Sequence, residues 1–169
     1  MKKLYHYAPK PNTVLKDGLL SISKNPVNLK PYSYEHRANS EREEDVMKWL
    51  ENSFYGRSRC VSGLTEPIKW QGNASMLKGF AKARELFSFD VEKLFDDGIA
   101  EAIYSKHGHN AIGLEEKIKR ITSPKEIDFS PLDWHLCNEE KGVFFGVIRH
   151  YFIVLKDGRI PPRYITKEG

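Results

Sequence analysis

The chain has 169 residues and a formal net charge of +4, from 27 Lys and Arg against 23 Asp and Glu. Its composition, 40% hydrophobic and 12% aromatic, suits one globular domain with a sizeable core, and we expect residues 1–169 to form a single domain. The net positive charge weakly favours an anionic ligand. Acids and bases are interspersed along the chain, however, and form no block of positive charge of the kind found in a nucleic-acid-binding tail.

The cysteines and the N-terminal residues disfavour disulfide-rich, zinc-binding and membrane-spanning proteins. Cys60 and Cys137 are far apart and in no paired metal-ligand spacing, so a disulfide framework and a zinc site are both disfavoured. After Lys2 and Lys3 there is no apolar run of signal-peptide length, and no segment approaches the roughly 18 apolar residues of a membrane span. We therefore expect no membrane and a cytoplasmic setting, although export without a cleaved signal would leave the same pattern.

The stretch 4–23, LYHYAPKPNTVLKDGLLSIS, is the part of the chain from which a function can be argued. It predicts a short strand with His6 between two tyrosines, then a turn, one or two helical turns and a Gly-Leu-Leu exit. A strand fixes its side chains more closely than a loop does, so a histidine near a strand end is well placed to serve a site. The alternative, more common for a lone histidine between tyrosines, is a half-buried strand residue with no further role.

The next segment predicts a helix and then a basic strand. The capping-box spacing of Ser40 and Glu43 predicts a helix over about 41–54, and its apolar positions recur at helical intervals. Residues 57–67 are then predicted to form a strand, in which Arg57 and Arg59 project from the same face. Two guanidinium groups so placed could hold a phosphate bidentately, and the alternative is a solvated strand edge.

Further elements follow in order. Residues 85–98 predict a strand followed by a short helix that Asp90 caps, and 99–104 predict a strand that contains Glu101. The charged stretch 114–121 predicts a helix with a solvated face. The apolar run 143–155 predicts a buried strand, interrupted at Gly146 and at Arg149-His150, before a D-G turn. No third ligand accompanies His107 and His109, so no metal site is expected.

Three patches of the sequence resemble a known superfamily. The opening L-Y-H-Y with its V-L-K-D-G-L-L exit is similar to the start of ADP-ribosyltransferase-fold proteins of the histidine-tyrosine-glutamate branch. The stretches FSFDVEKLFDDGI and VLKDGRIPPRYI are similar to the D-x-x-K-x-x-x-D-G-I and V-P-P-x-Y-I elements of the RNA 2'-phosphotransferases in that superfamily. Together the patches cover about a quarter of the chain, and their order along one small domain strengthens the resemblance.

The resemblance implies an α+β fold with a bent, split β-sheet and short flanking helices around a cleft that binds NAD as a substrate. It implies that His6 holds a ribose hydroxyl, that an aromatic residue stacks on nicotinamide and that a glutamate stabilises the oxocarbenium-like ribose. A fixed carboxylate suits that step, because positive charge develops on the ribose in the transition state. We therefore expect His6, Tyr7, Arg57 and Arg59 to bind the cofactor.

The catalytic glutamate has several candidates. We rank Glu101 and Glu140 above Glu66 and Glu139, because a catalytic carboxylate must enter the cleft from a strand start or a fixed loop. Residues 57–67 lack the Gly-His-Ser stretch of the phosphotransferases, so RNA 2'-phosphotransfer is not expected.

Three classes of function remain open from the sequence. The first is NAD-dependent ADP-ribosyl transfer to a protein or nucleic-acid acceptor, as in a toxin or effector. The second is non-enzymatic binding of nucleic acid or another anion by Arg57 and Arg59, with Trp70 as a stacking surface. The third, a hydrolase that uses Cys60 or Cys137 with a histidine, has no local signature in its support.

Overall fold

The computed structural model describes residues 2–25, 43–69, 75–107, 117–134 and 149–169. The strands of its large sheet are β1 (Lys3–Pro9), β3 (Cys60–Leu64), β4 (Arg84–Asp90), β5 (Ala100–His107), β6 (Lys117–Ile121), β7 (His150–Leu155) and β9 (Ile165–Lys167). A second ladder consists of β2 (Leu19–Leu20) and β8 (Arg159–Ile160). The helices are α1 (Val14–Asp17), α3 (Glu43–Ser53), α4 (Ser75–Lys82) and α5 (Val91–Asp96), with 3-10 turns η2 (Arg57–Arg59), η3 (Pro124–Glu126) and η6 (Pro162–Tyr164).

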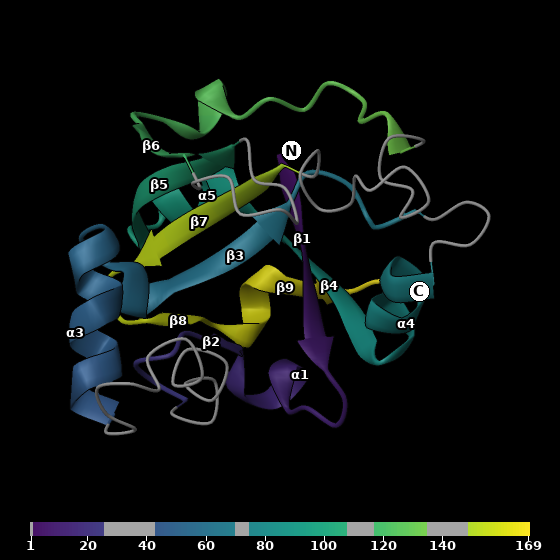
Figure 1. The fold of residues 1–169 in the computed structure, drawn as a ribbon, viewed down its shortest axis with the longest axis horizontal. Helices are drawn as coiled ribbons and strands as arrows, with labels where there is room; N and C mark the ends of the chain where they lie inside the picture. Colours follow the sequence, from purple (N-terminus) through teal and green to yellow (C-terminus); the bar gives the residue numbers. More distant parts are fainter. Residues whose placement is uncertain (1, 26–42, 70–74, 108–116, 135–148) are drawn as a thin grey trace.

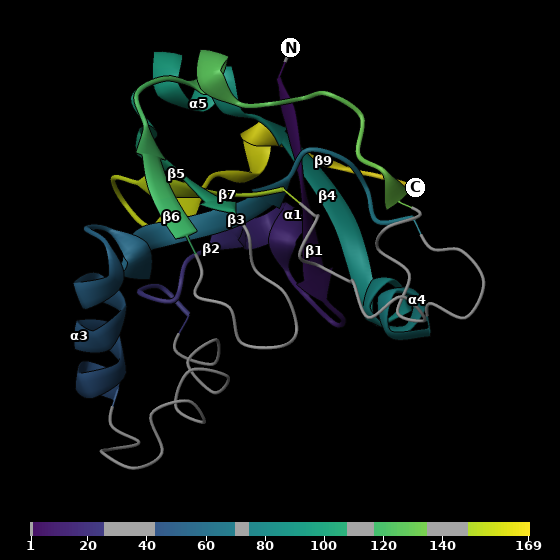
Figure 2. The same ribbon diagram turned by 45° about the horizontal axis from the view of Figure 1, so that its top comes forward.

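The fold is α+β, with an antiparallel sheet in the order β6-β5-β7-β3-β1-β4-β9 (Figure 1). Figures 1 and 2 both show α3 and α4 at opposite ends of the molecule, with α4 beside the start of β4. In the described ranges no helix has both the length and the apolar character needed to cross a membrane.

The two halves of the sheet meet at a narrow junction between β1 and β3. Seven residue pairs join β1 to β4, whereas the pair Tyr5 and Leu64 alone joins β1 to β3. A Cβ atom on Gly63 would lie 2.8 Å from the Cβ of Leu4, so only glycine allows β3 to approach β1 this closely. The junction therefore divides the sheet into β6-β5-β7-β3 and β1-β4-β9.

The main core lies on one face of the sheet and draws on both halves. Along β1 the side chains alternate: Leu4 and Ala8 enter this core, whereas Tyr5 and Tyr7 pack in a second cluster. The fully buried members of the main core include Leu4, Phe87, Val91, Leu94, Ile153, Leu155 and Ile160. The second cluster contains Leu64, Ile68, Leu77 and Trp134, and a third packs the end of α3 against β5 and β7.

Several sequence predictions are confirmed. Helix α3 lies within the predicted 41–54, and Leu50 and Phe54 of its apolar stripe are buried. The side chain of Asp90 caps α5 by accepting hydrogen bonds from two amides of its first turn. The predicted D-G turn is present, with Gly158 at φ 63°, a left-handed conformation that favours glycine.

Two local predictions are wrong. Residues 117–121 form strand β6, paired with β5, whereas a helix over 114–121 was predicted; 108–116 lie outside the described residues. The charged pattern suits both structures, since an edge strand also exposes charges on one face while Ile121 packs on the core. Arg57 and Arg59 lie in η2 and not in a strand, because Gly56 at φ 86° turns the chain and β3 begins only at residue 60.

Candidate functional site

His6 spans the junction between the two halves of the sheet. Its side chain projects from β1, and its Nδ1 lies 2.7 Å from the main-chain carbonyl oxygen of Ser62 on β3. A carbonyl oxygen only accepts hydrogen bonds, so Nδ1 carries the proton and donates it. The imidazole is therefore fixed in one tautomer at the place where the backbone pairing between β1 and β3 ends.

The protonation of His6 follows from its surroundings. Burial of the ring lowers the pKa of His6 below its usual 6.5, and the bond to Ser62 offsets this only in part. The ring is thus neutral at pH 7, with Nδ1 protonated and Nε2 left as a hydrogen-bond acceptor. A neutral imidazole of this kind can accept a hydrogen bond from a ligand hydroxyl.

Next to this junction lies a buried hydroxyl with no partner in the described part of the chain. Thr65 follows Leu64, the residue that pairs β3 with β1, and is 7% exposed. Its Oγ1 makes no hydrogen bond with the described residues. Because a buried hydroxyl normally finds a partner, Thr65 is suited to contact a bound molecule or a water at this place.

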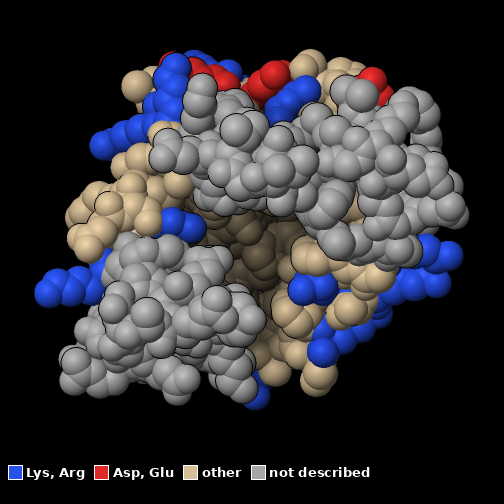
Figure 3. Space-filling view, viewed as in Figure 1, with Lys and Arg blue, Asp and Glu red and all other residues tan. Residues whose placement is uncertain are grey.

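The surface over the junction is hollowed. Figure 3 shows a hollow near the middle of its face, over the region where Figure 1 places the end of β3 beside β1. Lys and Arg side chains are visible on either side of it, whereas the visible Asp and Glu side chains lie along the upper edge of the view. This distribution of charge favours an anionic ligand.

Tyr7 faces away from His6. The Tyr7 hydroxyl oxygen accepts a hydrogen bond of 2.8 Å from the Ile68 amide, and the ring meets Phe80 edge-on with centroids 5.7 Å apart. Burial raises the pKa of Tyr7. These contacts fix Tyr7 in the second cluster, and its predicted role at the cofactor stays a prediction.

Arg59 and Glu101, predicted for two different roles, contact each other. Nη2 of Arg59 lies 2.8 Å from Oε1 of Glu101, and Nη1 of Arg59 donates to the Leu155 carbonyl oxygen at 3.0 Å. The pKa of Arg59 is raised despite its desolvation, because Glu101 bonds to it. The pair joins η2 to β5 at the end of β3 remote from the junction, about three residues or roughly 10 Å along the strand from Ser62.

The remaining predicted residues are placed as follows. Nη1 of Arg57 donates to Ser53 Oγ at 2.7 Å, and the guanidinium lies over the rings of Phe54 and Phe152. Glu140 lies outside the described residues, as do Glu139 and Trp70. In the described ranges, no group of three or more His, Cys, Asp or Glu is arranged to hold a metal ion.

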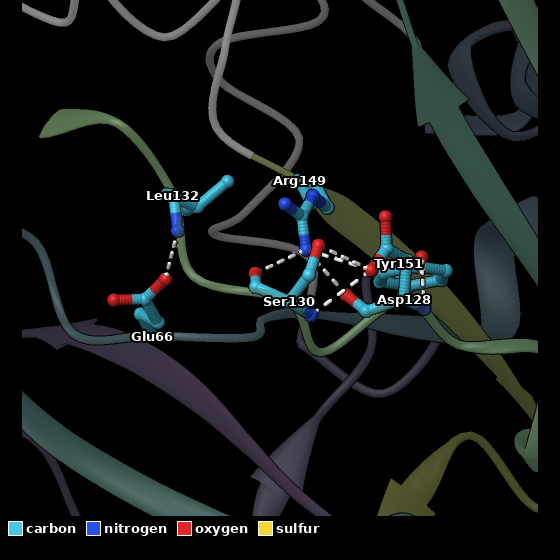
Figure 4. Close-up of polar contacts among 6 residues, drawn as sticks. All are labelled: Glu66, Asp128, Ser130, Leu132, Arg149 and Tyr151. Atoms are coloured by element: carbon cyan, nitrogen blue, oxygen red, sulfur yellow. Dashed lines mark hydrogen bonds and ion pairs between the residues drawn. The ribbon is translucent and has the colours of Figure 1, made fainter.

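The sequence did not reveal which side chains bind the segment 127–134 to the rest of the protein. Figure 4 shows Arg149, just before β7, reaching the 128–130 backbone: its Nη1 donates to the carbonyl oxygens of Asp128 at 2.7 Å and Ser130 at 2.6 Å. The same nitrogen lies 3.2 Å from the Asp128 carboxylate. The Tyr151 hydroxyl oxygen also accepts a 3.0 Å bond from the Asp128 amide. The Arg149 break in the apolar run was the one sequence signal of this arrangement.

Glu66, a lesser candidate for the catalytic carboxylate, holds the far end of the same segment. Its Oε2 accepts a 2.6 Å bond from the Leu132 amide, and its Oε1 accepts one of 3.2 Å from the indole Nε1 of Trp134. Residues 135–148, which contain Glu139 and Glu140, begin directly after this anchored point.

Comparison of the chain with protein-family models, with curated proteins and with solved structures finds no match. A function for the chain is therefore inferred from the geometry around His6.

Proposed function

We propose that this protein is an NAD-dependent ADP-ribosyltransferase that acts on a protein or nucleic-acid acceptor. The observation that carries the proposal is the fixed imidazole of His6, whose Nδ1 donates to Ser62 across the junction of the sheet. Nε2 is then an unprotonated acceptor, which is what holding a ribose hydroxyl requires.

The architecture supports the same proposal. The resemblance implies a split sheet with a histidine on its first strand, and β1 and β3 here share one residue pair beside His6. The hollow of Figure 3 lies over that junction, with cationic side chains beside it that suit a pyrophosphate.

The chemistry assigns separate tasks to the residues. His6 orients the ribose through a hydroxyl and needs no proton transfer, which agrees with a ring that burial keeps neutral. Cleavage of the bond to nicotinamide leaves positive charge on the ribose, which a carboxylate stabilises. Glu101 already forms an ion pair with Arg59, so we favour Glu140 for this role.

The test is release of nicotinamide from NAD, with His6→Ala and Ser62→Ala as a matched pair. His6→Ala removes the Nε2 acceptor and is expected to lower the rate at least tenfold. Ser62→Ala keeps the carbonyl oxygen that orients His6, so its rate should stay near that of the wild type. Equal rates for the wild type and His6→Ala, at equal thermal stability, would refute the role of His6.

Non-enzymatic anion binding by Arg57 and Arg59 is the weaker candidate, because both guanidinium groups already contact protein partners. Binding of NAD without any release of nicotinamide would favour that alternative.

A further inference from the structure

A basic surface surrounds the C-terminal end of α4, at the corner where β1 ends and β4 begins. It consists of Lys10, Lys78, Lys82 and Arg84, which we call the α4 corner. The three lysines are exposed, and Lys78 and Lys82 lie one helical turn apart. Figure 3 shows Lys and Arg side chains gathered at the right of the view, where Figure 1 places α4. We infer that the α4 corner binds the phosphate backbone of a single-stranded nucleic acid.

Hydrogen bonds bring these side chains together at the end of the helix. Nζ of Lys10, the residue that follows β1, donates to the Lys82 carbonyl oxygen at 3.5 Å. Nη1 of Arg84, the first residue of β4, donates to the Phe80 carbonyl oxygen at 3.1 Å. Lys10, Lys82 and Arg84 therefore meet around the last turn of α4, and Lys78 extends the surface by one turn.

The positive charges of the α4 corner have no acidic counterpart. None of its four side chains forms an ion pair with another residue that the structure describes. Two carboxylates on this side of the sheet are bound elsewhere, since Glu85 pairs with Lys167 at 2.9 Å and Glu168 with Lys3 at 2.7 Å. Lys10 acts on Glu85 only at longer range. Four unpaired cations in one corner match the formal net charge of the whole chain, +4, so this surface attracts anions.

The end of the helix uses only a small part of this charge. The C-terminal carbonyl groups of a helix are equivalent to roughly half a negative charge. Lys10 and Arg84 each donate one hydrogen bond to them, although an ammonium group has three N–H donors and a guanidinium has five. Most donors of the α4 corner thus remain available to a ligand.

Arg84 is the most firmly positioned of the four side chains. Its guanidinium lies over the Phe80 ring, 3.7 Å from the centroid, and the Phe80 ring in turn meets Tyr7 edge-on. Partial burial lowers the pKa of Arg84, and no neighbouring carboxylate offsets that desolvation. Nε and Nη2 of Arg84 make no hydrogen bond with the described residues. This edge of the guanidinium is therefore a fixed fork that can bind a phosphate through two hydrogen bonds.

A nucleic-acid strand suits this arrangement better than an acidic peptide does. Successive phosphates can contact the fixed guanidinium and the flexible lysines, while a base stacks on the face of Arg84 that is turned away from Phe80. An acidic peptide has no base for that face.

The position of Arg84 relates the bound strand to the junction of the sheet. Arg84 pairs with Pro9, three residues or roughly 10 Å along β1 from His6. A strand on the α4 corner would thus lie near the place where NAD is proposed to react, and could serve as the acceptor of ADP-ribose. That role rests on the proposed function, whereas the binding itself does not require NAD.

The test measures binding of a fluorescein-labelled oligothymidylate of about 10 nucleotides by fluorescence anisotropy, without NAD. Each phosphate contact with a single strand contributes about 0.7 to the slope of log affinity against log salt, so Lys78→Gln with Lys82→Gln should reduce the slope by roughly 1.4. Lys48→Gln is the matched control, because Lys48 is exposed on α3 at the opposite end of the molecule. It should leave both the affinity and the slope unchanged.

Arg84→Lys separates the fork from the charge. It keeps one positive charge but cannot bind a phosphate through two coplanar N–H groups, so we expect binding about tenfold weaker with an unchanged salt slope. Thermal unfolding of each variant shows whether its fold is retained. A glutamate-rich peptide with the same number of charges, added as a competitor, should displace the oligonucleotide far less well than unlabelled oligothymidylate does.

Three results would overturn the inference. The first is no binding at about 100 μM protein in low salt, the weak limit of non-specific nucleic-acid binding. The second is an equal loss of affinity in Lys48→Gln and in the Lys78 and Lys82 double variant, which would mean a response to surface charge in general. The third is equal displacement by the acidic peptide, which would make the α4 corner a site for acidic proteins. Nicotinamide release without oligonucleotide binding would overturn this inference alone, and binding without release would refute only the proposed transferase.

Discussion

Replacing Gly63 by alanine tests whether the two halves of the sheet meet as closely as the structure shows. The added Cβ would lie 2.8 Å from Leu4 Cβ, 3.2 Å from Leu4 Cδ1 and 3.3 Å from Phe89 Cζ. A Cδ1 atom can move by a rotamer change, but the Cβ of Leu4 moves only with its backbone, and Leu4 is fully buried. The strands must therefore separate or the core must distort.

The expected cost of Gly63→Ala is that of an overpacked core, about 1–3 kcal/mol. For a chain of this size a loss of about 2 kcal/mol lowers the melting temperature by roughly 4–8 °C. Gly79→Ala is the control, because Gly79 is in α4 with nothing within 4 Å of the added atom. That change should stabilise the protein by up to about 1 kcal/mol through helix propensity. Urea unfolding that shows Gly63→Ala as stable as the wild type would refute the close approach.

The remaining predictions concern charge and protonation. Since burial lowers the pKa of His6 from 6.5, the unfolded chain takes up this proton first as the pH falls. The free energy of unfolding should hence decline below about pH 6.5, and His6→Gln should flatten the decline between about pH 7 and 5 in urea titrations. A double-mutant cycle on Arg59 and Glu101, whose side chains are 24% and 29% exposed, should give a coupling of about 1 kcal/mol; zero coupling would contradict the pair. Burial raises the pKa of Cys60 to about 12, so in a Cys137→Ser background its alkylation at about pH 8 should be slow until the protein is unfolded, and rapid alkylation of the native protein would contradict this. Asp90→Ala should cost about 1 kcal/mol in urea unfolding through loss of the cap of α5, and an unchanged midpoint would show that the cap contributes nothing.

The elements that sequence analysis found were those specified by local chemistry. The capping side chain of Asp90, the glycine turn at Gly158 and the apolar stripe of α3 depend on residues within a few positions of one another. The 117–121 strand was missed because its pairing with β5, and not its own pattern, decides its structure.

The site was predictable only in part, for the same reason. His6 was found from its strand, but its partner is a main-chain carbonyl, which leaves no signature in the sequence. The contact of Arg59 with Glu101 depends on the order β5-β7-β3, and the hold of Arg149 on residues 128–130 crosses about 20 positions. Such contacts follow from topology, which a single sequence specifies only weakly.

Nitrogen-15 NMR of the histidine side chains tests directly whether His6 presents an unprotonated Nε2 to NAD. In the free protein at about pH 7, we predict the neutral tautomer with Nδ1 protonated for His6, assigned by comparison with His6→Gln. Addition of NAD should shift the Nε2 resonance of His6 as it accepts a ribose hydroxyl, and Ser62→Ala should show the same shift. A proton on Nε2 in the free protein, or a His6 signal that saturating NAD leaves unchanged, would contradict the role proposed for His6.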